Sequence, residues 1–324
     1  MGRTLITGGA GYIGIELVDE LLQAGHDVTV LDRLLHGQND RAEELRGRGV
    51  TVVEGDIRDP VARGHALQGA EAVVHLAAIV GDPACARDPQ LAQEVNVDAS
   101  LALATEAGEA GVERFVMAST CSNYGRMADP TTPIDETGVL APVSLYAEQK
   151  VAVEQHLLGL DPPPFAVSCL RFATVYGVAP RMRFDLTVNE FARDLWAEKD
   201  LEVFGEQFWR PYVHVRDAAR GIRTVLLAPV EQVAGEVFNI GDTRENYRKL
   251  DLVTEIRKQT DKGNVSYVQR TEDPRDYKVA FGKVHATLGY EITKTVPEGI
   301  AEVLAALDEG RFPDAFEPRY RNTP

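Results

Sequence analysis

The amino-acid sequence predicts an α/β protein built on a doubly wound parallel sheet. Short apolar runs alternate with stretches of helical periodicity through the first half of the chain, and a glycine-rich turn joins the first apolar run to the first helical stretch. Strands that alternate with helices in this way lie parallel, with helices on both faces of the sheet. Ligands then bind beyond the carboxyl ends of the strands, where the strand order reverses.

The apolar runs predict six strands in the first half of the chain and one core strand later. The first six cover residues 4–7, 28–31, 51–54, 72–76, 114–118 and 166–171. The later core strand covers residues 236–240. The amphipathic run at 13–22 predicts the first helix, and further helices are expected between the other strands.

Glycines dominate the turn between the first strand and the first helix. Glycine lets the backbone turn tightly, lets phosphates approach the main chain and lets the helix pack closely on the sheet. The free N–H groups and the positive dipole end of the helix then offer a site for a pyrophosphate. The spacing predicts a Rossmann-type dinucleotide site, with cofactor contacts from Gly8, Gly11, Tyr12, Ile13 and Gly14.

Asp32 ends the second predicted strand. A carboxylate at this place can accept hydrogen bonds from the adenosine ribose hydroxyls, and it repels the extra phosphate of NADP. We therefore expect NAD as the cofactor. The neighbouring Arg33 is the one feature of this segment that argues the other way, and it too is a candidate cofactor-binding residue.

The pattern and the composition of the sequence change after Gly177. The predicted helical and extended segments become shorter, and Arg, Phe and Trp become more frequent. We therefore expect a smaller, discontinuous α/β substrate domain. The predicted division gives residues 1–176 and 211–240 to the Rossmann domain, and residues 177–210 and 241–324 to the substrate domain.

Composition restricts the partners and the setting of the chain. The formal net charge of −16 argues against nucleic acid, because phosphate binding needs a basic surface. The apolar runs are too short to cross a membrane, the three cysteines form no disulfide or metal pattern, and the seven histidines show no ligand spacing. We expect a cytoplasmic protein without a bound metal.

Tyr146 and Lys150 lie four residues apart, which places them on one face of a helix. A lysine ammonium near a phenol, with an oxidised nicotinamide alongside, lowers the pKa of the phenol, and the phenolate can then take the proton of a substrate alcohol. Thr120 ends the fifth strand and can hydrogen-bond the same substrate oxygen. Tyr290 and Lys294 have the same spacing, but they follow an expected helix end late in the chain, so we expect a chance pair.

With these residues in place, the chain resembles the extended short-chain dehydrogenase/reductase superfamily, in its NAD-dependent nucleotide-sugar epimerase/dehydratase branch. The segments that carry the resemblance cover most of the chain in the expected order. They are the glycine turn at 7–14, GDIRD at 55–59, HLAA at 75–78, Asn96-Val97, the segment 119–125, Tyr146 with Lys150, Leu170-Arg171 and RPYVHV at 210–215.

The resemblance implies roles for residues in these segments. Tyr146 would be the catalytic base or acid and would also contact the cofactor. Lys150 would be the ribose anchor, and Thr120 the hydroxyl partner. Asp56 and Ile57 would flank the adenine. Leu76, Ala77 and Ala78 would line the cofactor. The substrates of the family are sugars on a nucleoside diphosphate, and the implied substrate contacts are Thr174, Asn189, Arg210 and Arg275. We expect Arg181 and Arg183 to be surface cations.

The sequence departs from the family pattern near both reacting groups. Thr174 stands where relatives often carry an asparagine near the diphosphate. Cys121 and Ser122 follow Thr120 where the related 4,6-dehydratases carry an Asp-Glu pair that removes water across two carbons. Cys121 and Ser122 are therefore candidates for catalytic residues. Some sugar 3,5-epimerases use a cysteine in this loop, but aligned on Tyr124-Gly125 that cysteine falls at Ser122, so Cys121 is better explained as a small packing residue.

The resemblance favours an NAD-dependent nucleotide-sugar epimerase, which oxidises its sugar transiently to a 4-keto sugar and reduces it on the other face. The first alternatives are a 4-ketoreductase, which Asp32 disfavours because such enzymes favour NADP, and a 4,6-dehydratase, which the missing acidic pair disfavours. An alternative of another class is a non-catalytic dinucleotide sensor, but such relatives commonly lose Tyr146 or Lys150.

Relatives in the family dimerise through a four-helix bundle, so we also expect a homodimer. The helix after Asn96 and the helix that carries Tyr146 each show an additional small or apolar face. These faces are formed by Ala99, Ala102, Leu103, Val151, Val153 and Leu157.

Overall fold

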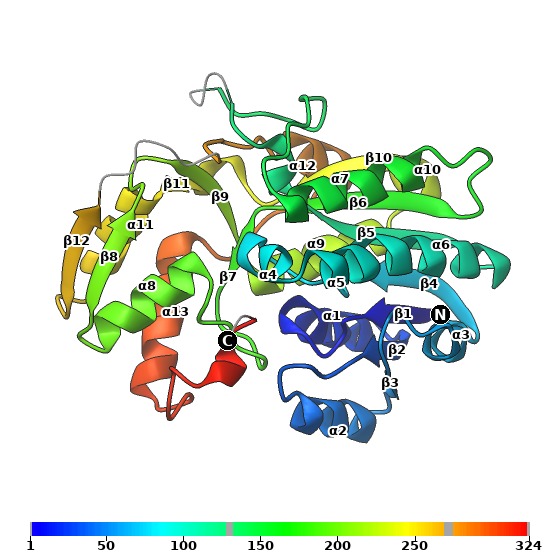
Figure 1. Cartoon of the computed structure of the whole chain (residues 1–324), viewed down its shortest axis with the longest axis horizontal. Coiled ribbons are helices and arrows are strands. Elements are labelled where there is room, and N and C mark those ends of the chain that lie inside the picture. The colour runs from blue at the N-terminus through cyan, green and yellow to red at the C-terminus, as the bar shows by residue number, and fades with distance from the viewer. Residues whose placement is uncertain (1, 128–131, 269–274, 323–324) are drawn as a thin grey trace.

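The computed structural model describes residues 2–127, 132–268 and 275–322, and it contains a seven-stranded parallel sheet (Figure 1). The strand order is β10-β6-β5-β4-β1-β2-β3. The strands are β1 (Arg3–Thr7), β2 (Asp27–Asp32), β3 (Thr51–Glu54), β4 (Ala70–His75), β5 (Arg114–Thr120), β6 (Ala166–Phe172) and β10 (Glu236–Ile240). The predicted fold class is confirmed, and each predicted strand overlaps one strand of this sheet.

The strand order reverses at β1, which pairs with β2 on one side and with β4 on the other. The chain therefore leaves the carboxyl ends of β1 and β4 in opposite directions, and a crevice opens between the two connections.

Helices cover both faces of the sheet (Figure 1). One face is covered by α1 (Tyr12–Gln23), α2 (Asn39–Gly47), α9 (Val215–Leu227), α10 (Val230–Val233) and α12 (Gly282–Leu288). The other is covered by α3 (Pro60–Leu67), α4 (Asp82–Arg87), α5 (Pro89–Gln93), the π-helical turn η1 (Glu94–Asp98), α6 (Ala99–Glu109) and α7 (Leu145–Leu158). Strands buried on both faces are apolar throughout, which is why the sequence marks them clearly.

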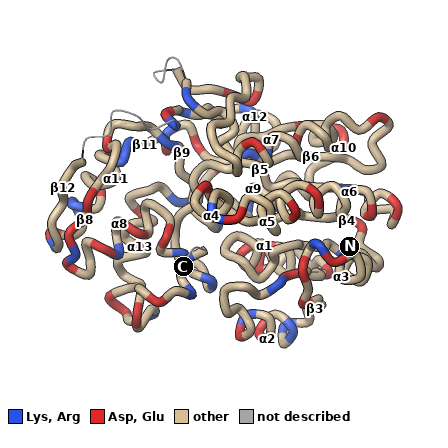
Figure 2. Tube along the Cα trace, viewed as in Figure 1, with Lys and Arg blue, Asp and Glu red and all other residues tan. Residues whose placement is uncertain are grey.

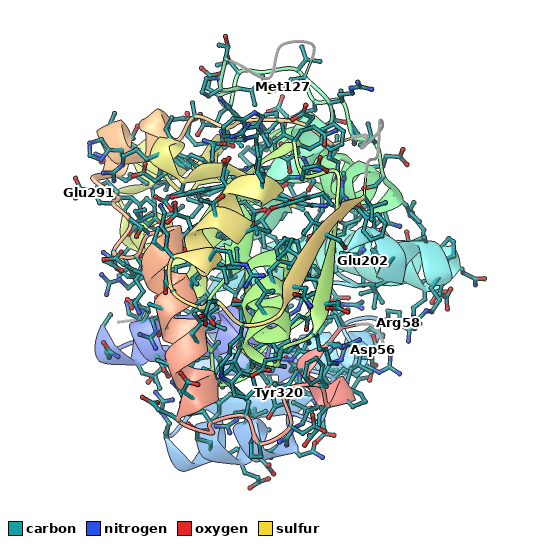
Figure 3. The ribbon with its side chains drawn as sticks, turned by 90° about the vertical axis from the view of Figure 1, so that its left-hand side faces the viewer. Asp56, Arg58, Met127, Glu202, Glu291 and Tyr320 are labelled. Carbon is teal, nitrogen blue, oxygen red and sulfur yellow. The ribbon has the colours of Figure 1, made fainter. Side chains whose placement is uncertain are left out.

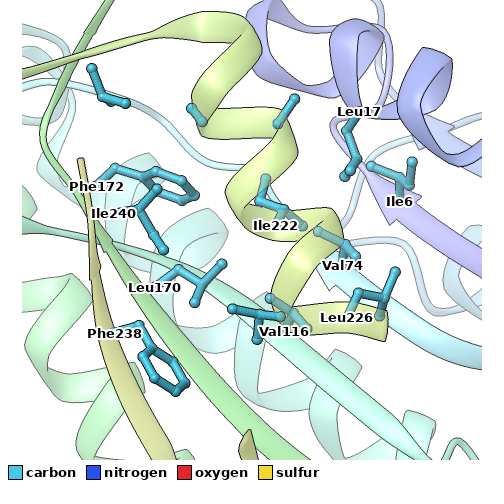
Figure 4. Close-up of a cluster of buried hydrophobic side chains, with 14 of the residues drawn as sticks. Ile6, Leu17, Val74, Val116, Leu170, Phe172, Ile222, Leu226, Phe238 and Ile240 are labelled. Carbon is cyan, nitrogen blue, oxygen red and sulfur yellow. The ribbon is translucent and has the colours of Figure 1, made fainter. Parts of the chain in front are cut away.

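The core on the α9 side shows how the strands divide their side chains between the two faces (Figure 4). Ile6 belongs to the apolar cluster beneath α9, whereas Leu5 belongs to the cluster on the opposite face. This alternation follows from the two-residue period of a strand. Helix α9 contributes Ile222 and Leu226, which lie one turn apart on the same helix face.

A third apolar cluster holds the remaining elements together. Strands β7 (Thr174–Tyr176), β9 (Trp209–His214) and β11 (Asn246–Arg248) form one small sheet, and β8 (Asp200–Phe204) pairs with β12 (Asn264–Val268). Helices α8 (Thr187–Trp196), α11 (Lys249–Arg257) and α13 (Val296–Asp308) pack with them. Short 3-10 turns lie at η2 (Cys121–Tyr124), η3 (Thr243–Glu245) and η4 (Pro318–Tyr320).

The division into a domain of residues 1–176 with 211–240 and one of residues 177–210 with 241–324 stays a prediction. Side-chain packing modifies its C-terminal part. Tyr277, Phe281 and Val284 belong to the apolar cluster of the large sheet, because α12 packs against β10. The segment around α12 therefore packs with the large sheet rather than with α8 and α13.

Charged residues of both signs are interspersed over the helices and loops (Figure 2). The excess of 50 acidic over 34 basic side chains is therefore spread along the chain. Within residues 2–127, 132–268 and 275–322, no helix combines the length and the apolar character that a membrane span requires.

Candidate active site

A cavity of about 500 Å³ lies at the carboxyl edge of the large sheet, where the strand order reverses. The ends of β1 to β5 contribute to its wall, and the segments 172–186 and 275–277 complete it. The cavity brings together most of the residues singled out in the sequence. They are Gly8, Gly11, Tyr12, Ile13, Gly14, Asp32, Arg33, Asp56, Ile57, Leu76, Ala77, Ala78, Thr120, Ser122, Tyr146, Lys150, Thr174 and Arg275.

The glycine turn forms a cradle of main chain at one end of the cavity. Gly8 has φ +73°, and a Cβ atom there would lie 2.9 Å from the backbone nitrogen of Ala77. A Cβ atom on Gly14 would lie 2.4 Å from the carbonyl oxygen of Gly8. Helix α1 begins after Gly11, which offers no side-chain cap. Its first N–H groups are thus left for a ligand, and the cradle fits the pyrophosphate of NAD.

Asp32 is fixed at the end of β2 by two backbone hydrogen bonds. Its Oδ2 accepts from the N–H of Ala10 at 3.0 Å, and its Oδ1 accepts from the N–H of Leu34 at 2.9 Å. Burial raises the pKa of the carboxyl, and these two hydrogen bonds counteract the rise. Each oxygen keeps a lone pair for a further donor, so the carboxylate fits the ribose hydroxyls of NAD.

Asp56 and Arg58 lie side by side at the end of β3 (Figure 3). The Arg58 guanidinium donates to both carboxylate oxygens of Asp56, and this pairing lowers the pKa of the Asp56 carboxyl. Arg33 approaches the same carboxylate at 3.1 Å, with about half of its side chain exposed. Arg33, Asp56 and the buried Ile57 form a wall of the cavity that can flank an adenine ring.

The loop after β4 is held by a buried polar network. Thr7 Oγ1 is 2.7 Å from His75 Nδ1 and accepts from the N–H of Ala77 at 3.2 Å. Burial lowers the pKa of His75 to about 3, so the ring stays neutral. Asn96, in the π-helical turn, accepts from the N–H of Ile79 at 2.8 Å and donates to its carbonyl oxygen. These bonds fix the backbone of 76–79 against the cavity.

Tyr146 and Lys150 face the cavity from the first two turns of α7, whose N-cap is Ser144. The Lys150 ammonium is 3% exposed, lies 5.9 Å from the centroid of the Tyr146 ring and donates to the carbonyl oxygen of Ala118 at 2.9 Å. Burial lowers the pKa of Lys150 to about 8 and raises the pKa of Tyr146 above its usual value. A positive charge brought alongside the phenol counteracts that rise. Thr120 completes the group from the end of β5.

A buried network that the sequence analysis missed supports this group from below. Glu154, two turns after Tyr146 on α7, pairs with the Arg171 guanidinium, and both side chains are at most 5% exposed. The Ser119 hydroxyl donates to Glu154 at 2.7 Å, and Arg171 donates to Tyr124 at 2.9 Å. The network ties α7 to β5 and β6. The sequence does contain a signal for this network, because Glu154 follows Lys150 by four residues, just as Lys150 follows Tyr146.

The far end of the cavity is lined by polar side chains that are already paired with one another. The Ser122 hydroxyl lies 3.3 Å from the Tyr277 hydroxyl. Asp82 accepts from Arg275 at 2.8 Å and from the Ser144 hydroxyl at 2.6 Å. Arg275, expected as a substrate residue, thus lines the cavity as half of an ion pair that joins α4 to the C-terminal third of the chain.

Three predicted site residues lie outside the cavity lining. Cys121 is 1% exposed, and its thiol donates to the carbonyl oxygen of Arg171 at 3.2 Å, because the turn after Thr120 directs it into the core. Burial raises its pKa well above the usual value. Asn189 is fully buried and binds the N–H of Gly177 at 2.9 Å, so it holds a loop. The Arg210 guanidinium lies 5.3 Å from the centroid of the Tyr277 ring, behind the cavity wall.

Several residues of the cavity wall were missed or misjudged in the sequence. Arg181 and Arg183, expected at the surface, both line the cavity, and Arg181 is only 6% exposed. Tyr277 was not predicted. The helix end expected before Tyr290 is confirmed, because Gly289 ends α12. The Tyr290 hydroxyl donates to the carbonyl oxygen of Asp217, and its ring belongs to the apolar cluster of the large sheet.

Comparison of the chain with known proteins identifies the family to which it belongs. Residues 4–241 match the model of the NAD dependent epimerase/dehydratase family. The chain is 30% identical to the UDP-glucose 4-epimerase of Erwinia amylovora, with 93% of this chain and 95% of that one aligned. It is 28% identical to the UDP-glucose 4-epimerase of Bacillus subtilis, with 92% and 94% aligned.

Solved structures show the same similarity. A UDP-glucose 4-epimerase of Thermus thermophilus in complex with NAD superposes with a TM-score of 0.83 at 27% identity, over 94% of this chain and 99% of that one. A dTDP-glucose 4,6-dehydratase of Streptomyces venezuelae with NAD bound gives 0.84 at 28% identity, over 95% and 98%. The relatives thus include both an epimerase and a dehydratase.

Proposed function

Because the chain belongs to the NAD-dependent epimerase/dehydratase family, we propose that it is an NAD-dependent nucleotide-sugar 4-epimerase. The observation that carries the proposal is that Thr120, Tyr146 and Lys150 line one cavity with the dinucleotide cradle. Its similarity to UDP-glucose 4-epimerases over most of both chains supports a sugar on a nucleoside diphosphate as the substrate.

NAD, when bound, would supply reversible hydride transfer at the reacting carbon of the sugar. Tyr146 takes the proton of the reacting hydroxyl, and it returns the proton after the 4-keto sugar has rotated in the site. The Lys150 ammonium stabilises the phenolate by its charge, and the Thr120 hydroxyl holds the substrate oxygen in place. Thr120 comes from the end of β5, and Tyr146 and Lys150 come from the first two turns of α7.

The residues after Thr120 favour an epimerase over a dehydratase. Removal of water needs an acid and a base beside the sugar, but the Cys121 thiol lies in the core with a raised pKa. The Ser122 hydroxyl, which does line the cavity, is a poor acid at its ordinary pKa and lies within hydrogen-bond distance of Tyr277.

A panel of UDP-, dTDP-, CDP- and GDP-sugars tests the proposal. The protein is incubated with each sugar and a trace of NAD, and the products are analysed by mass spectrometry and NMR. An epimerase converts many equivalents into a product of unchanged mass with the C4 hydroxyl inverted. A product lighter by one water would identify a dehydratase, and stoichiometric use of reduced cofactor would identify a ketoreductase.

We further propose that the protein acts as a homodimer in the cytoplasm. Helices α6 and α7 pack together on one outer face of the sheet (Figure 1). Of the faces predicted for the interface, Ala99, Leu103, Val153 and Leu157 are buried in the protein's own core. Val151 is 9% exposed, and Ala102 is the partly exposed member. All three cysteines are free and buried, in keeping with a reducing compartment. Light scattering after gel filtration tests the dimer, and a monomer mass would contradict it.

A further inference from the structure

Arg181 is a buried cation in the wall of the cavity. It lies in the loop between β7 and α8, which also carries Arg183. Arg181 is 6% exposed. The loop is fastened to the start of α1, because the Tyr12 hydroxyl donates to the carbonyl oxygen of Gly177 at 2.6 Å. Arg181 thus lines the same cavity as the glycine cradle but comes from a different part of the chain.

The guanidinium of Arg181 is incompletely satisfied. Nη2 donates to the carbonyl oxygen of Arg321 at 3.3 Å, whereas Nε has no hydrogen-bond partner among the residues that the structure describes. Arg183 differs, because its guanidinium makes two hydrogen bonds to Asp185. Burial and the nearby Arg183 lower the pKa of Arg181 to about 10. A buried cation in this condition is stabilised by an anion placed in the cavity.

The C-terminal segment, which carries Tyr320 (labelled in Figure 3), is hydrogen-bonded to the loop that carries Arg181. The N–H of Phe184 donates to the carbonyl oxygen of Tyr320 at 2.8 Å, and the rings of these two residues meet edge to face. The N–H of Asn322 donates to Asp185 at 3.0 Å. Asn322 also lines the cavity, and its Oδ1 has no partner within the described part of the chain.

The electrostatic neighbours of Arg181 include two residues at the cofactor end of the cavity. Arg181 interacts with Asp32 and Tyr12, at the cofactor end. Arg183 interacts with Tyr12 and also with Tyr146, so its neighbours lie at both ends of the cavity. In the half of NAD that lies between Asp32 and the start of α1, only the pyrophosphate is anionic.

We propose that Arg181 is a cofactor-binding residue, and that its guanidinium pairs with the pyrophosphate of NAD opposite the N-terminus of α1. The loop after β7 and the C-terminal segment then hold the cofactor from the side opposite the glycine cradle. The inference rests on NAD as the cofactor and not on the identity of the sugar.

Titration of the purified apoprotein with NAD, ADP-ribose and adenosine tests this role. Arg181→Met should weaken NAD and ADP-ribose by a similar factor of roughly 10 to 100, the worth of a charge-assisted contact, and should leave adenosine unchanged. Arg181→Lys should recover part of the loss. Because the substitution removes an unsatisfied buried charge, the melting temperature of the apoprotein should not fall.

Arg193→Met is the matched control. Arg193 is 2% exposed and its Nη1 also lacks a partner within the described part of the chain, but it stacks on Phe184 and Phe316 outside the cavity. Its loss should leave NAD affinity unchanged. The proposal is wrong if Arg181→Met binds NAD within twofold of the native protein, weakens adenosine as much as ADP-ribose, or raises only the KM for a nucleotide sugar. These titrations stand whether or not the protein is an epimerase.

Discussion

The cofactor end of the cavity is built mainly from main chain, whereas the catalytic end is built from side chains. At the cofactor end, the turn around Gly8 and Gly14 shapes the cradle by the absence of side chains. At the catalytic end, Tyr146 and Lys150 depend on a buried ion pair beneath them. The comparison teaches that the two ends can be damaged separately. A substitution that distorts the backbone of the cradle should impair cofactor binding, whereas a substitution among the buried polar and charged side chains should impair turnover.

Removing the Tyr146 hydroxyl gives the largest expected effect. Tyr146→Phe should lower turnover by roughly 10²–10⁴-fold, the usual worth of a positioned proton-transfer group. NAD affinity should stay unchanged, because the cradle is made by other residues. Steady-state rates and NAD titration measure the two effects. Tyr290→Phe is the control and should leave turnover intact. Full activity in Tyr146→Phe would mean that the helix pair is only structural.

Breaking the buried ion pair should cost almost as much, but in stability. Arg171→Met leaves the carboxylate of Glu154 buried without its partner, which destabilises a protein by about 3–5 kcal/mol. Urea unfolding measures the free energy. The double variant Arg171→Met/Glu154→Leu should recover most of the loss. A single variant that unfolds within about 1 kcal/mol of the native protein, a typical surface effect, would contradict the role of the network.

Lys150 should make stability depend on pH. Burial lowers its pKa to about 8, from about 10.4 in an unfolded chain. Between these values the folded state releases the proton while the unfolded state keeps it, so this group makes the free energy of unfolding rise with pH. The two pKa values correspond to about 3 kcal/mol. Lys150→Met should lack this rise, and urea unfolding at pH 7 and pH 10 compares the proteins. Parallel curves would show that Lys150 is not desolvated.

A methyl group in the cradle gives the smallest expected effect. It should weaken NAD binding and leave turnover unchanged, which is the opposite of the effect of Tyr146→Phe. The Cβ of Gly14→Ala would lie 2.4 Å from the carbonyl oxygen of Gly8. Backbone strain of about 1–3 kcal/mol should raise the Kd for NAD roughly tenfold, with little change in kcat at saturating NAD. Gly64→Ala, whose Cβ meets no atom within 4 Å, is the control for titration. An unchanged affinity for NAD in Gly14→Ala would contradict the role of the main-chain cradle in binding the cofactor.

Local signals explain what could be predicted from the sequence. The strand at 236–240 is visible because both faces of β10 are buried, and Tyr146 and Lys150 are visible because four residues make about one helical turn. The glycine turn is similarly contained within one short segment. Each of these features needs only neighbouring residues to form.

What the sequence could not predict depends on contacts between distant segments. The turn after Thr120 decides that Ser122 lines the cavity and that Cys121 is buried in the core. Arg181 is buried because a segment about 140 positions later covers it, with Arg321 as its hydrogen-bond partner. Arg210 lies behind the cavity because Tyr277 stands in front of it.

The central claim is that the catalytic end removes and restores hydrogen at C4 of a nucleotide sugar without net change in the cofactor. A substrate labelled with deuterium at C4, followed by NMR and mass spectrometry, tests it most directly. The account predicts that the product carries the label at C4 with the opposite configuration and has the same mass as the substrate. Transfer of the label to C6 with loss of water would contradict it, and so would stoichiometric transfer of the label to the cofactor.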